Sequence, residues 1–302
     1  MNLENPNTTN RIALGAAKFG MNYGIYGSEK VSEQEVGKIL NYAEEKKINT
    51  IDTAIGYGES EKVLGKMEIS RWKIVTKIPA IPESKKDLAE WVIKSIHHSL
   101  ERLKIPKIYG LLLHKSEDLL GSQGHQLYSA LLKCKDMGLV QKIGISIYNP
   151  TNLEEILYKY PIDLIQAPLN VIDRRLITEI SPTRGSWLDI LDKSGVEIHV
   201  RSIFLQGLLL MKKNQRPKKF SRWSDSWTKW HKWLAQNNFS AIEACLKFAL
   251  NYPKIDRVVV GVSSLKEMKQ LFNLSKKDLV RVPIFENSMD PDLINPYNWS
   301  KL

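Results

Sequence analysis

Residues 73–114, KIVTKIPAIPESKKDLAEWVIKSIHHSLERLKIPKIYGLLLH, decide the fold, because they contain one complete strand–helix–strand unit. The segments Lys73–Ile78 and Ile108–His114 are short, continuous apolar runs. Such runs are typical of parallel strands that are buried on both faces. The longer segment between them, Lys86–Leu103, has the apolar period of a helix. The unit therefore predicts two parallel strands joined by a helical crossover.

The same unit recurs along the whole chain. Short apolar runs predict eight strands, at Arg11–Gly15, Asn49–Thr53, Lys73–Ile78, Ile108–His114, Lys142–Ile147, Asp163–Ala167, Glu197–Phe204 and Arg257–Val262. Helical periods lie between them, at Ser32–Lys47, Lys86–Leu103, Gln126–Met137, Asn152–Tyr158, Ser240–Leu250 and Ser264–Leu274. This alternation predicts a closed (β/α)8 TIM barrel. A doubly wound sheet is the alternative, but the even size of the units and the lack of GxGxxG after the first strand count against it.

The composition predicts a single globular domain that spans residues 1–302. The length suits one α/β barrel, and 43% apolar with 25% charged residues is ordinary for a globular protein. The start of the chain lacks the pattern of a secretory signal, and no apolar run is long enough to span a bilayer. The two cysteines, Cys134 and Cys245, lie far apart within helical patterns, as expected of buried thiols in a reducing compartment. We therefore expect a cytoplasmic protein with no membrane span and no metal site.

The formal net charge of +11 favours an anionic partner, such as nucleic acid, an acidic membrane or a phosphorylated small molecule. The lysines are scattered, and the densest basic stretch, Lys212–Lys219, carries no nucleic-acid-binding motif. We interpret that stretch as a solvated loop. The sequence therefore predicts a small-molecule substrate and no nucleic-acid partner.

One irregular insertion, Lys212–Asn238, interrupts the alternation and contains four tryptophans: Trp223, Trp227, Trp230 and Trp233. The last three are spaced by three residues, as on one side of a helix. One interpretation is an amphipathic helix that buries a tryptophan face. The other is a lid over the barrel mouth that stacks on a ring-bearing ligand. The two interpretations are compatible.

Four polar residues lie at or just after three adjacent predicted strand ends, where active sites of this fold are found. Asp52 ends the second strand, Tyr57 follows it in the loop, Lys77 ends the third strand and His114 ends the fourth. Taken singly, each has a structural explanation, such as a helix cap, an ion pair or a rim histidine. Because all four can converge on one point, we expect them to form a catalytic cluster.

These residue types suit the reduction of a carbonyl group. Hydride delivery to a carbonyl carbon leaves an alkoxide that needs a proton, and tyrosine, with a pKa of about 10, is a poor acid near neutrality. A nearby ammonium, here Lys77, is expected to lower the pKa of Tyr57, with Asp52 keeping the lysine charged and oriented. His114 can donate a hydrogen bond that positions the substrate oxygen.

The segment IDTAIGYGESEKVLG, residues 51–65, resembles the Asp-Thr-Ala…Tyr-Gly signature of the aldo-keto reductases, and the resemblance extends over nearly the whole chain. It implies a (β/α)8 barrel and an NADP(H)- or NAD(H)-dependent oxidoreductase. It also implies that Asp52, Tyr57, Lys77 and His114 form the catalytic tetrad, with Tyr57 as the proton donor.

The resemblance implies a further set of residues around the cofactor and substrate. Ser146 and Gln166 match contacts to the nicotinamide carboxamide, Ser202 matches a pyrophosphate contact, and Ala17, Lys18 and Phe19 match a segment beneath the nicotinamide, with Phe19 in the substrate pocket. The turn VVVGVSSLKEM, with Gly261, Ser263 and Glu267, matches the place where a helix N-terminus holds phosphate.

The chain departs from the family pattern in three places. Ile147 stands where an asparagine is usual, and Asn149 is a candidate substitute. Arg201 stands where a tyrosine usually stacks on the cofactor, and an arginine can stack on a ring and also pair with phosphate. Glu267 falls where NADPH-dependent members usually carry an arginine, which predicts that NADH is used at least comparably to NADPH.

The phrases LGAAKFGMNYGI and RSIFLQGLLL resemble a bacterial subgroup associated with surface-polysaccharide and nucleotide-sugar pathways. The resemblance implies a sugar or nucleotide-sugar substrate. Two other functions remain open at this stage: a Schiff-base aldolase that uses Lys77, and a regulatory protein that binds the cofactor without turnover.

Overall fold

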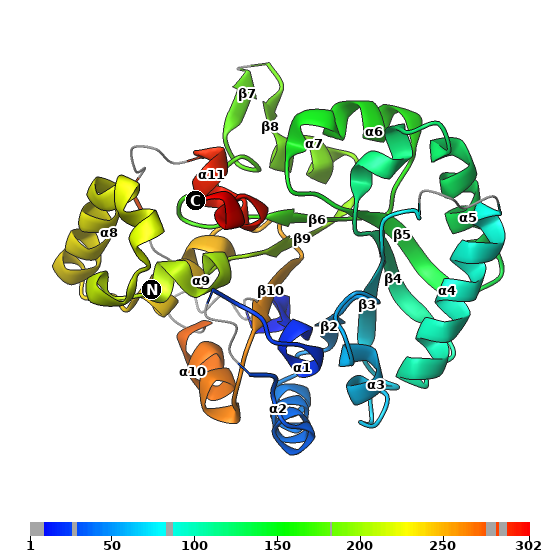
Figure 1. Ribbon diagram of the computed structural model, residues 1–302, viewed down its shortest axis with the longest axis horizontal. Helices are drawn as coiled ribbons and strands as arrows, with labels where there is room; N and C mark the ends of the chain where they lie inside the picture. The colour runs from blue at the N-terminus through cyan, green and yellow to red at the C-terminus, as the bar shows by residue number, and fades with distance from the viewer. Residues whose placement is uncertain (1–8, 26–28, 83–86, 182, 276–281, 284–288) are drawn as a thin grey trace, which may run out of the picture.

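The computed structural model describes residues 9–25, 29–82, 87–181, 183–275, 282–283 and 289–302. Its parallel strands form a closed barrel in the order β1-β10-β9-β6-β5-β4-β3-β2 (Figure 1). The strands are β1 (Ile12–Gly15), β2 (Thr50–Asp52), β3 (Lys73–Ile78), β4 (Ile108–Leu113), β5 (Val140–Ser146), β6 (Leu164–Pro168), β9 (Glu197–Arg201) and β10 (Arg257–Gly261). All eight predicted strands and the TIM-barrel fold are confirmed.

Six helices that the sequence predicts are present, and each of their ends lies within two residues of the predicted position. They are α2 (Glu33–Glu45), α4 (Leu88–Leu103), α5 (Gly124–Asp136), α6 (Leu153–Lys159), α9 (Ala241–Leu250) and α10 (Leu265–Ser275). The Oγ atoms of Ser32 and Ser240 cap α2 and α9, as their positions predict. The predicted start of the helix between the third and fourth strands, residue 86, lies outside the described residues.

The sequence did not predict the shorter elements, because they contain too few residues for a helical or strand periodicity of apolar residues to be recognised. They are the helices α1 (Ala17–Gly20), α3 (Ser60–Leu64), α7 (Trp187–Lys193) and α11 (Pro291–Ile294), and the hairpin of β7 (Glu179–Ser181) and β8 (Gly185–Ser186). The hairpin lies outside the barrel wall in the crossover between β6 and β9 (Figure 1).

The core has two parts. A large cluster fills the space between the strands and the surrounding helices, and a small one joins Val75, Leu112 and Leu164 from three strands. Because side chains alternate along a strand, Val75 and Lys77 share one side of β3. The small apolar cluster therefore supports Lys77 from below.

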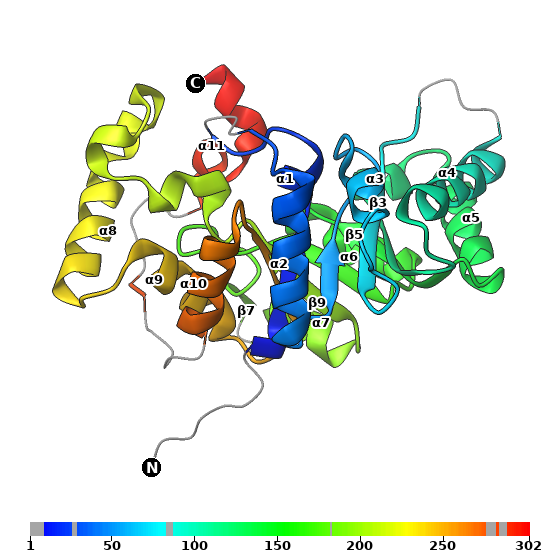
Figure 2. The same ribbon diagram turned by 90° about the horizontal axis from the view of Figure 1, so that it is seen from below.

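The tryptophan-rich insertion contains α8 (Ser224–Gln236), which lies on the outer side of α9 in both views (Figures 1 and 2). Trp227 and Trp230 are buried, and their indole N–H groups donate to the carbonyl oxygens of Phe220 and Leu209. The amphipathic-helix interpretation is confirmed. The lid interpretation stays a prediction.

The same insertion contacts the C-terminal segment. Arg222 forms ion pairs with Asp290 and Asp292, the indole N–H of Trp223 donates to Asp290, and Lys219 Nζ donates to the carbonyl oxygen of Trp299. The insertion therefore anchors α11 and the 3-10 helix η7 (Pro296–Lys301) beside the barrel (Figure 2).

Cys134 and Cys245 are buried and free, as predicted. Among the helices of the described residues, none combines the length and hydropathy that crossing a membrane would require.

Candidate active site

A buried ion pair lies at the carboxyl ends of two neighbouring strands. Lys77 Nζ donates to both carboxylate oxygens of Asp52, at 2.7 and 2.8 Å, and to the carbonyl oxygen of Thr53 at 2.9 Å. Lys77 is fully buried and Asp52 is 4% exposed. The Nε2 atom of Gln166 also donates to Asp52, at 2.6 Å. The network fixes the ammonium of Lys77, because all three of its N–H groups donate a hydrogen bond.

Tyr57 and His114 lie against this ion pair. The Nζ atom of Lys77 is 5.1 Å from the centre of the Tyr57 ring. The rings of Tyr57 and His114 meet edge to face, with centres 5.8 Å apart. The structure thus brings together all four residues of the expected catalytic cluster.

The loop that carries Tyr57 is held by close backbone packing. A Cβ atom at Gly20 would stand 2.2 Å from the carbonyl oxygen of Tyr57, so only glycine fits there. The Oγ atom of Ser60 donates to the carbonyl oxygen of Ala16 at 2.8 Å. In the next turn, buried Glu61 accepts two hydrogen bonds from Arg102, at 2.8 and 2.6 Å. These contacts fix the position of the phenol relative to Lys77.

The pKa of Tyr57 is raised above its ordinary value, which is opposite to the lowering that the sequence led us to expect. Burial is the largest cause, and the charge of Asp52 raises this pKa further, while Arg201 lowers it. Tyr57 is therefore a protonated phenol in this state, as a proton donor must be.

His114 is a neutral imidazole over most of the pH range. Burial, followed by the charges of Lys77 and Arg201, lowers its pKa to about 4. A neutral imidazole carries one N–H, so His114 can donate a hydrogen bond to a neighbouring oxygen without adding a charge to the site.

A cavity of about 710 Å³ extends from Asp52 and Tyr57 to the start of α10. Nine of the predicted site residues line it: Ala17, Lys18, Asp52, Tyr57, Arg201, Ser202, Gly261, Ser263 and Glu267. Ser146 and Gln166 are buried beside it, with Ser146 Oγ 3.5 Å from Gln166 Oε1. The structure does not bring Phe19 to the cavity, because its ring is fully buried in the core. The assignment of Phe19 to the substrate pocket is therefore corrected.

Arg201 forms part of the cavity wall. Its Nη2 atom donates to the carbonyl oxygen of Ile147 at 3.0 Å, and its Nη1 atom donates to Ser202 Oγ at 3.1 Å. The guanidinium carbon lies 4.1 Å from the centre of the Tyr148 ring, which in turn contacts the ring of Tyr297 with centres 5.0 Å apart. The C-terminal segment therefore reaches the same rim as Arg201.

At the other end of the cavity, carboxylates accept hydrogen bonds from backbone N–H groups at the start of α10. Glu267 Oε2 accepts from the backbone N–H of Ser263 at 2.7 Å, and Glu35 Oε1 accepts from the N–H of Leu265 at 2.7 Å. Lys18 Nζ donates to Ser263 Oγ at 2.8 Å. The amides that the sequence suggested for phosphate are thus already paired within the chain.

Several cavity residues were not predicted from the sequence. Tyr23, Gln206, Met211, Gln215 and Gln270 also line the wall, and none of them follows a strand end directly. The loop after β9 brings Gln206 inward through left-handed backbone angles, with φ of 52°. Gly207 was the only local indication of a turn at this place.

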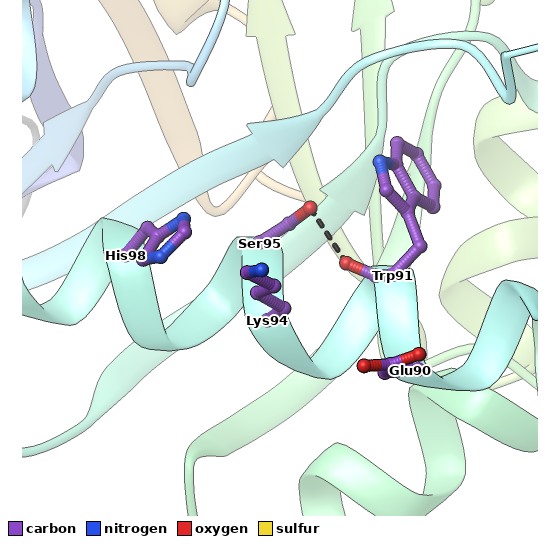
Figure 3. A pocket seen from close by; sticks show the side chains of 5 residues that line it. All are labelled: Glu90, Trp91, Lys94, Ser95 and His98. Carbon is purple, nitrogen blue, oxygen red and sulfur yellow. Dashed lines mark hydrogen bonds between the residues drawn. The ribbon is translucent and has the colours of Figure 1, made fainter.

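A second hollow, of about 330 Å³, lies on the outer face of α4 (Figure 3). Its lining residues Glu90, Trp91, Lys94, Ser95 and His98 all come from that one helix. Ser95 donates to the carbonyl oxygen of Trp91 in its own helix. Because none of the predicted site residues lines this hollow, we do not assign the chemistry to it. Within the described residues, no group of three or more metal-ligating side chains is assembled.

Comparison with known proteins agrees with this geometry. The aldo/keto reductase family model matches residues 11–282. The chain is 28% identical over 278 residues to L-galactose dehydrogenase from Arabidopsis thaliana, covering 86% of this chain and 82% of that protein. It is 27% identical to NADH-specific methylglyoxal reductase from Escherichia coli, covering 54% of each chain. The holo form of an aldo-keto reductase from Bacillus halodurans superposes with a TM-score of 0.68 at 21% identity, covering 90% of this chain and 88% of that one.

Proposed function

The chain belongs to the aldo/keto reductase family, and we propose that it interconverts the carbonyl and alcohol forms of a sugar or nucleotide sugar with Tyr57 as the proton donor. Family membership makes it an NAD(P)-dependent oxidoreductase that acts on a small-molecule carbonyl compound. The observation that carries the proposal is the cluster at the cavity end, where Tyr57 lies between the Lys77–Asp52 ion pair and His114.

The cavity suits a nicotinamide dinucleotide. Its lining runs from Asp52 and Tyr57 to Ser263 and Glu267 at the start of α10, and its volume of about 710 Å³ lies within the usual range for cofactor sites. Ser146 and Gln166 would hold the carboxamide, and Arg201 and Ser202 would lie beside the nicotinamide and the pyrophosphate. When bound, the nicotinamide supplies or accepts the hydride.

The chain's own residues handle the proton and the geometry. Tyr57 gives its phenolic proton to the substrate oxygen during reduction and takes it back during oxidation. The N–H of neutral His114 orients that oxygen. Lys77, fixed by Asp52, stabilises the charge that develops on Tyr57 when the proton leaves.

The two alternative functions are disfavoured. A Schiff-base lysine must reach its substrate as a free amine, whereas Lys77 is fully buried and bonded to Asp52 and Thr53. A regulatory protein would not need the complete cluster at the cavity end. The two buried free cysteines fit the reducing cytoplasm in which we infer that the enzyme works.

Segment 212–238 is proposed to influence substrate choice. Gln215 lines the cavity, and the neighbouring residues of the segment hold the C-terminal segment that reaches Tyr148. The tryptophans are proposed to act indirectly, because none of the four lines the cavity. Any stacking on the substrate would then fall to Tyr148 and Tyr297.

A substrate panel tests the proposed function. Sugars and nucleotide sugars with a carbonyl group should be reduced with higher kcat/KM than simple neutral aldehydes, as measured by absorbance of the reduced cofactor. The motivation is the net charge of +11, which attracts phosphorylated compounds. Added salt should raise KM for the phosphorylated substrates only. Equal kcat/KM for simple neutral aldehydes and for phosphorylated sugars would contradict this substrate class.

The start of α10 predicts that NADH is used at least comparably to NADPH. A 2′-phosphate at this end of the cavity would meet the carboxylates of Glu267 and Glu35, whereas a free 2′-hydroxyl can donate to a carboxylate. The Glu267→Arg variant should raise kcat/KM with NADPH relative to NADH, and Glu101→Arg, on the exposed side of α4 and outside the cavity lining, should leave the ratio unchanged. A strict NADPH preference in the wild type, unaltered by Glu267→Arg, would show that the phosphate binds elsewhere.

A further inference from the structure

Arg201 is a cation at the reactive end of the cavity whose described partners are all neutral. The guanidinium donates to the carbonyl oxygen of Ile147 and to Ser202 Oγ, and it stacks on the ring of Tyr148. A guanidinium is weakly hydrated and planar, so it can remain charged while stacked in this way. Its charge is therefore exposed to whatever occupies the cavity.

The other charged groups at this end cancel one another. Asp52 and Lys77 form an ion pair, with Lys77 Nζ 2.7 Å from Asp52 Oδ1, and the lowered pKa of His114 keeps that imidazole neutral. Lys18 and Glu267 both bond to Ser263, at the opposite end of the cavity. Within the described part of the chain, Arg201 thus leaves one uncompensated positive charge beside Tyr57.

The two oxidation states of the nicotinamide differ by one positive charge at the ring. The reduced ring is uncharged, and the oxidised ring is a pyridinium cation. We propose that Arg201 makes the enzyme bind the reduced cofactor in preference to the oxidised one, so that a site exposed to both is loaded mainly with the hydride donor for carbonyl reduction. This inference rests on the proposed function, in which Arg201 lies beside the nicotinamide.

The reaction that this cofactor preference affects is the reduction of a carbonyl group to an alcohol. A carbonyl compound, reduced cofactor and a proton give an alcohol and oxidised cofactor; the hydride goes to the carbonyl carbon and the proton passes from Tyr57 to the oxygen. Tyr57 then recovers a proton from solvent. A protein that binds the reduced cofactor more tightly than the oxidised one also retards oxidation by the same cofactor pair at equal concentrations.

Binding measurements without substrate test this inference. The Kd values of NADH and NAD⁺ would be measured by calorimetry for the wild type, Arg201→Gln, Arg201→Lys and Arg184→Gln. Both cofactors carry the same diphosphate, so the ratio Kd(NAD⁺)/Kd(NADH) isolates the ring charge. Arg184, whose partner is Glu154 near the outer hairpin, is the matched control.

The wild type should bind NADH more tightly, and Arg201→Gln should lower the ratio by about tenfold. This magnitude is the Coulomb interaction of two unit charges about 5 Å apart, discounted for the solvent that reaches a half-buried guanidinium. Arg201→Lys should keep most of the preference, and Arg184→Gln should keep all of it. Because salt screens the same interaction, the wild-type ratio should also fall as ionic strength rises.

A wild-type ratio near one, or a ratio that Arg201→Gln leaves unchanged, would overturn the inference while leaving the proposed function intact. If Arg201→Gln does not fold, a wild-type ratio that is insensitive to salt has the same consequence. Failure of the wild type to bind either cofactor would instead contradict the proposed function itself.

Discussion

Tyr57→Phe is expected to lower kcat by roughly 10²–10⁴-fold, which is the usual contribution of a general acid–base group. The variant keeps the ring that contacts His114 and Lys77 but removes the proton that the substrate oxygen requires. Because the hydroxyl is not needed for packing, the fold and the cofactor affinity should stay close to those of the wild type.

Steady-state kinetics, cofactor titration and thermal unfolding of the Tyr57→Phe variant check this prediction together. Tyr23→Phe is the matched control, because Tyr23 lines the same cavity but is not part of the catalytic cluster. It should retain most of the turnover. Near-native rates in Tyr57→Phe, or an equal loss in both variants, would remove Tyr57 from the role of proton donor.

Asp52→Asn is expected to cost both activity and stability. The substitution leaves the fully buried ammonium of Lys77 without its anion, and breaking a buried pair from one side typically costs about 3–5 kcal/mol of unfolding free energy. The pKa of Lys77 is already lowered by burial, and Asp52 is what opposes that shift. Turnover should fall because an unpaired Lys77 is no longer held charged beside Tyr57.

The pH dependence of the stability loss identifies its cause. Burial already lowers the pKa of Lys77 in the folded wild type below the 10.5 of an ordinary lysine, and Asp52 opposes that shift, so loss of the Asp52 charge should lower the pKa further in the folded variant. The unfolded state then binds more protons, so the stability of the variant relative to the wild type should recover as pH rises toward that value. Urea unfolding at several pH values measures this recovery.

The double variant Asp52→Asn/Lys77→Met provides the control. It removes both charges, so most of the lost stability should return, while the enzyme stays inactive because Tyr57 has lost its cationic neighbour. Two outcomes would contradict this explanation: a double variant as unstable as Asp52→Asn, or an Asp52→Asn variant as stable as the wild type. Either would show that Asp52 does not stabilise the fold by compensating the buried charge of Lys77.

The sequence was sufficient to predict the barrel and the place where the four residues of the proposed catalytic cluster meet. Strands buried on both faces give continuous apolar runs, and their carboxyl ends meet at one rim, so Asp52, Lys77 and His114 could be brought together without coordinates. The direction of the pKa shift of Tyr57 could not be predicted, because it depends on how far the phenol is buried and on how near the charges of Asp52 and Arg201 lie to it.

The wall of the cavity was the harder part to predict. Tyr23 and Gln206 lie in loops whose backbone paths are set by tertiary packing, including left-handed angles that non-glycine residues seldom adopt. Glu35 is a helix residue that looked like part of a capping box, yet it also bonds to the first turn of α10, 230 positions away. Local spacing carries no information about such a contact.

The link between the insertion and the C-terminal segment has a practical consequence for handling the protein. Because Lys219 and Arg222 hold residues 290–299, and Tyr297 touches Tyr148 at the rim, the last turn of the chain belongs to the surroundings of the cavity. An affinity tag fused after Leu302 would emerge next to the place where ligands enter. The amino end of β1 lies at the opposite end of the barrel from the rim that carries Tyr57, so a tag placed before β1 joins the barrel farther from the cavity.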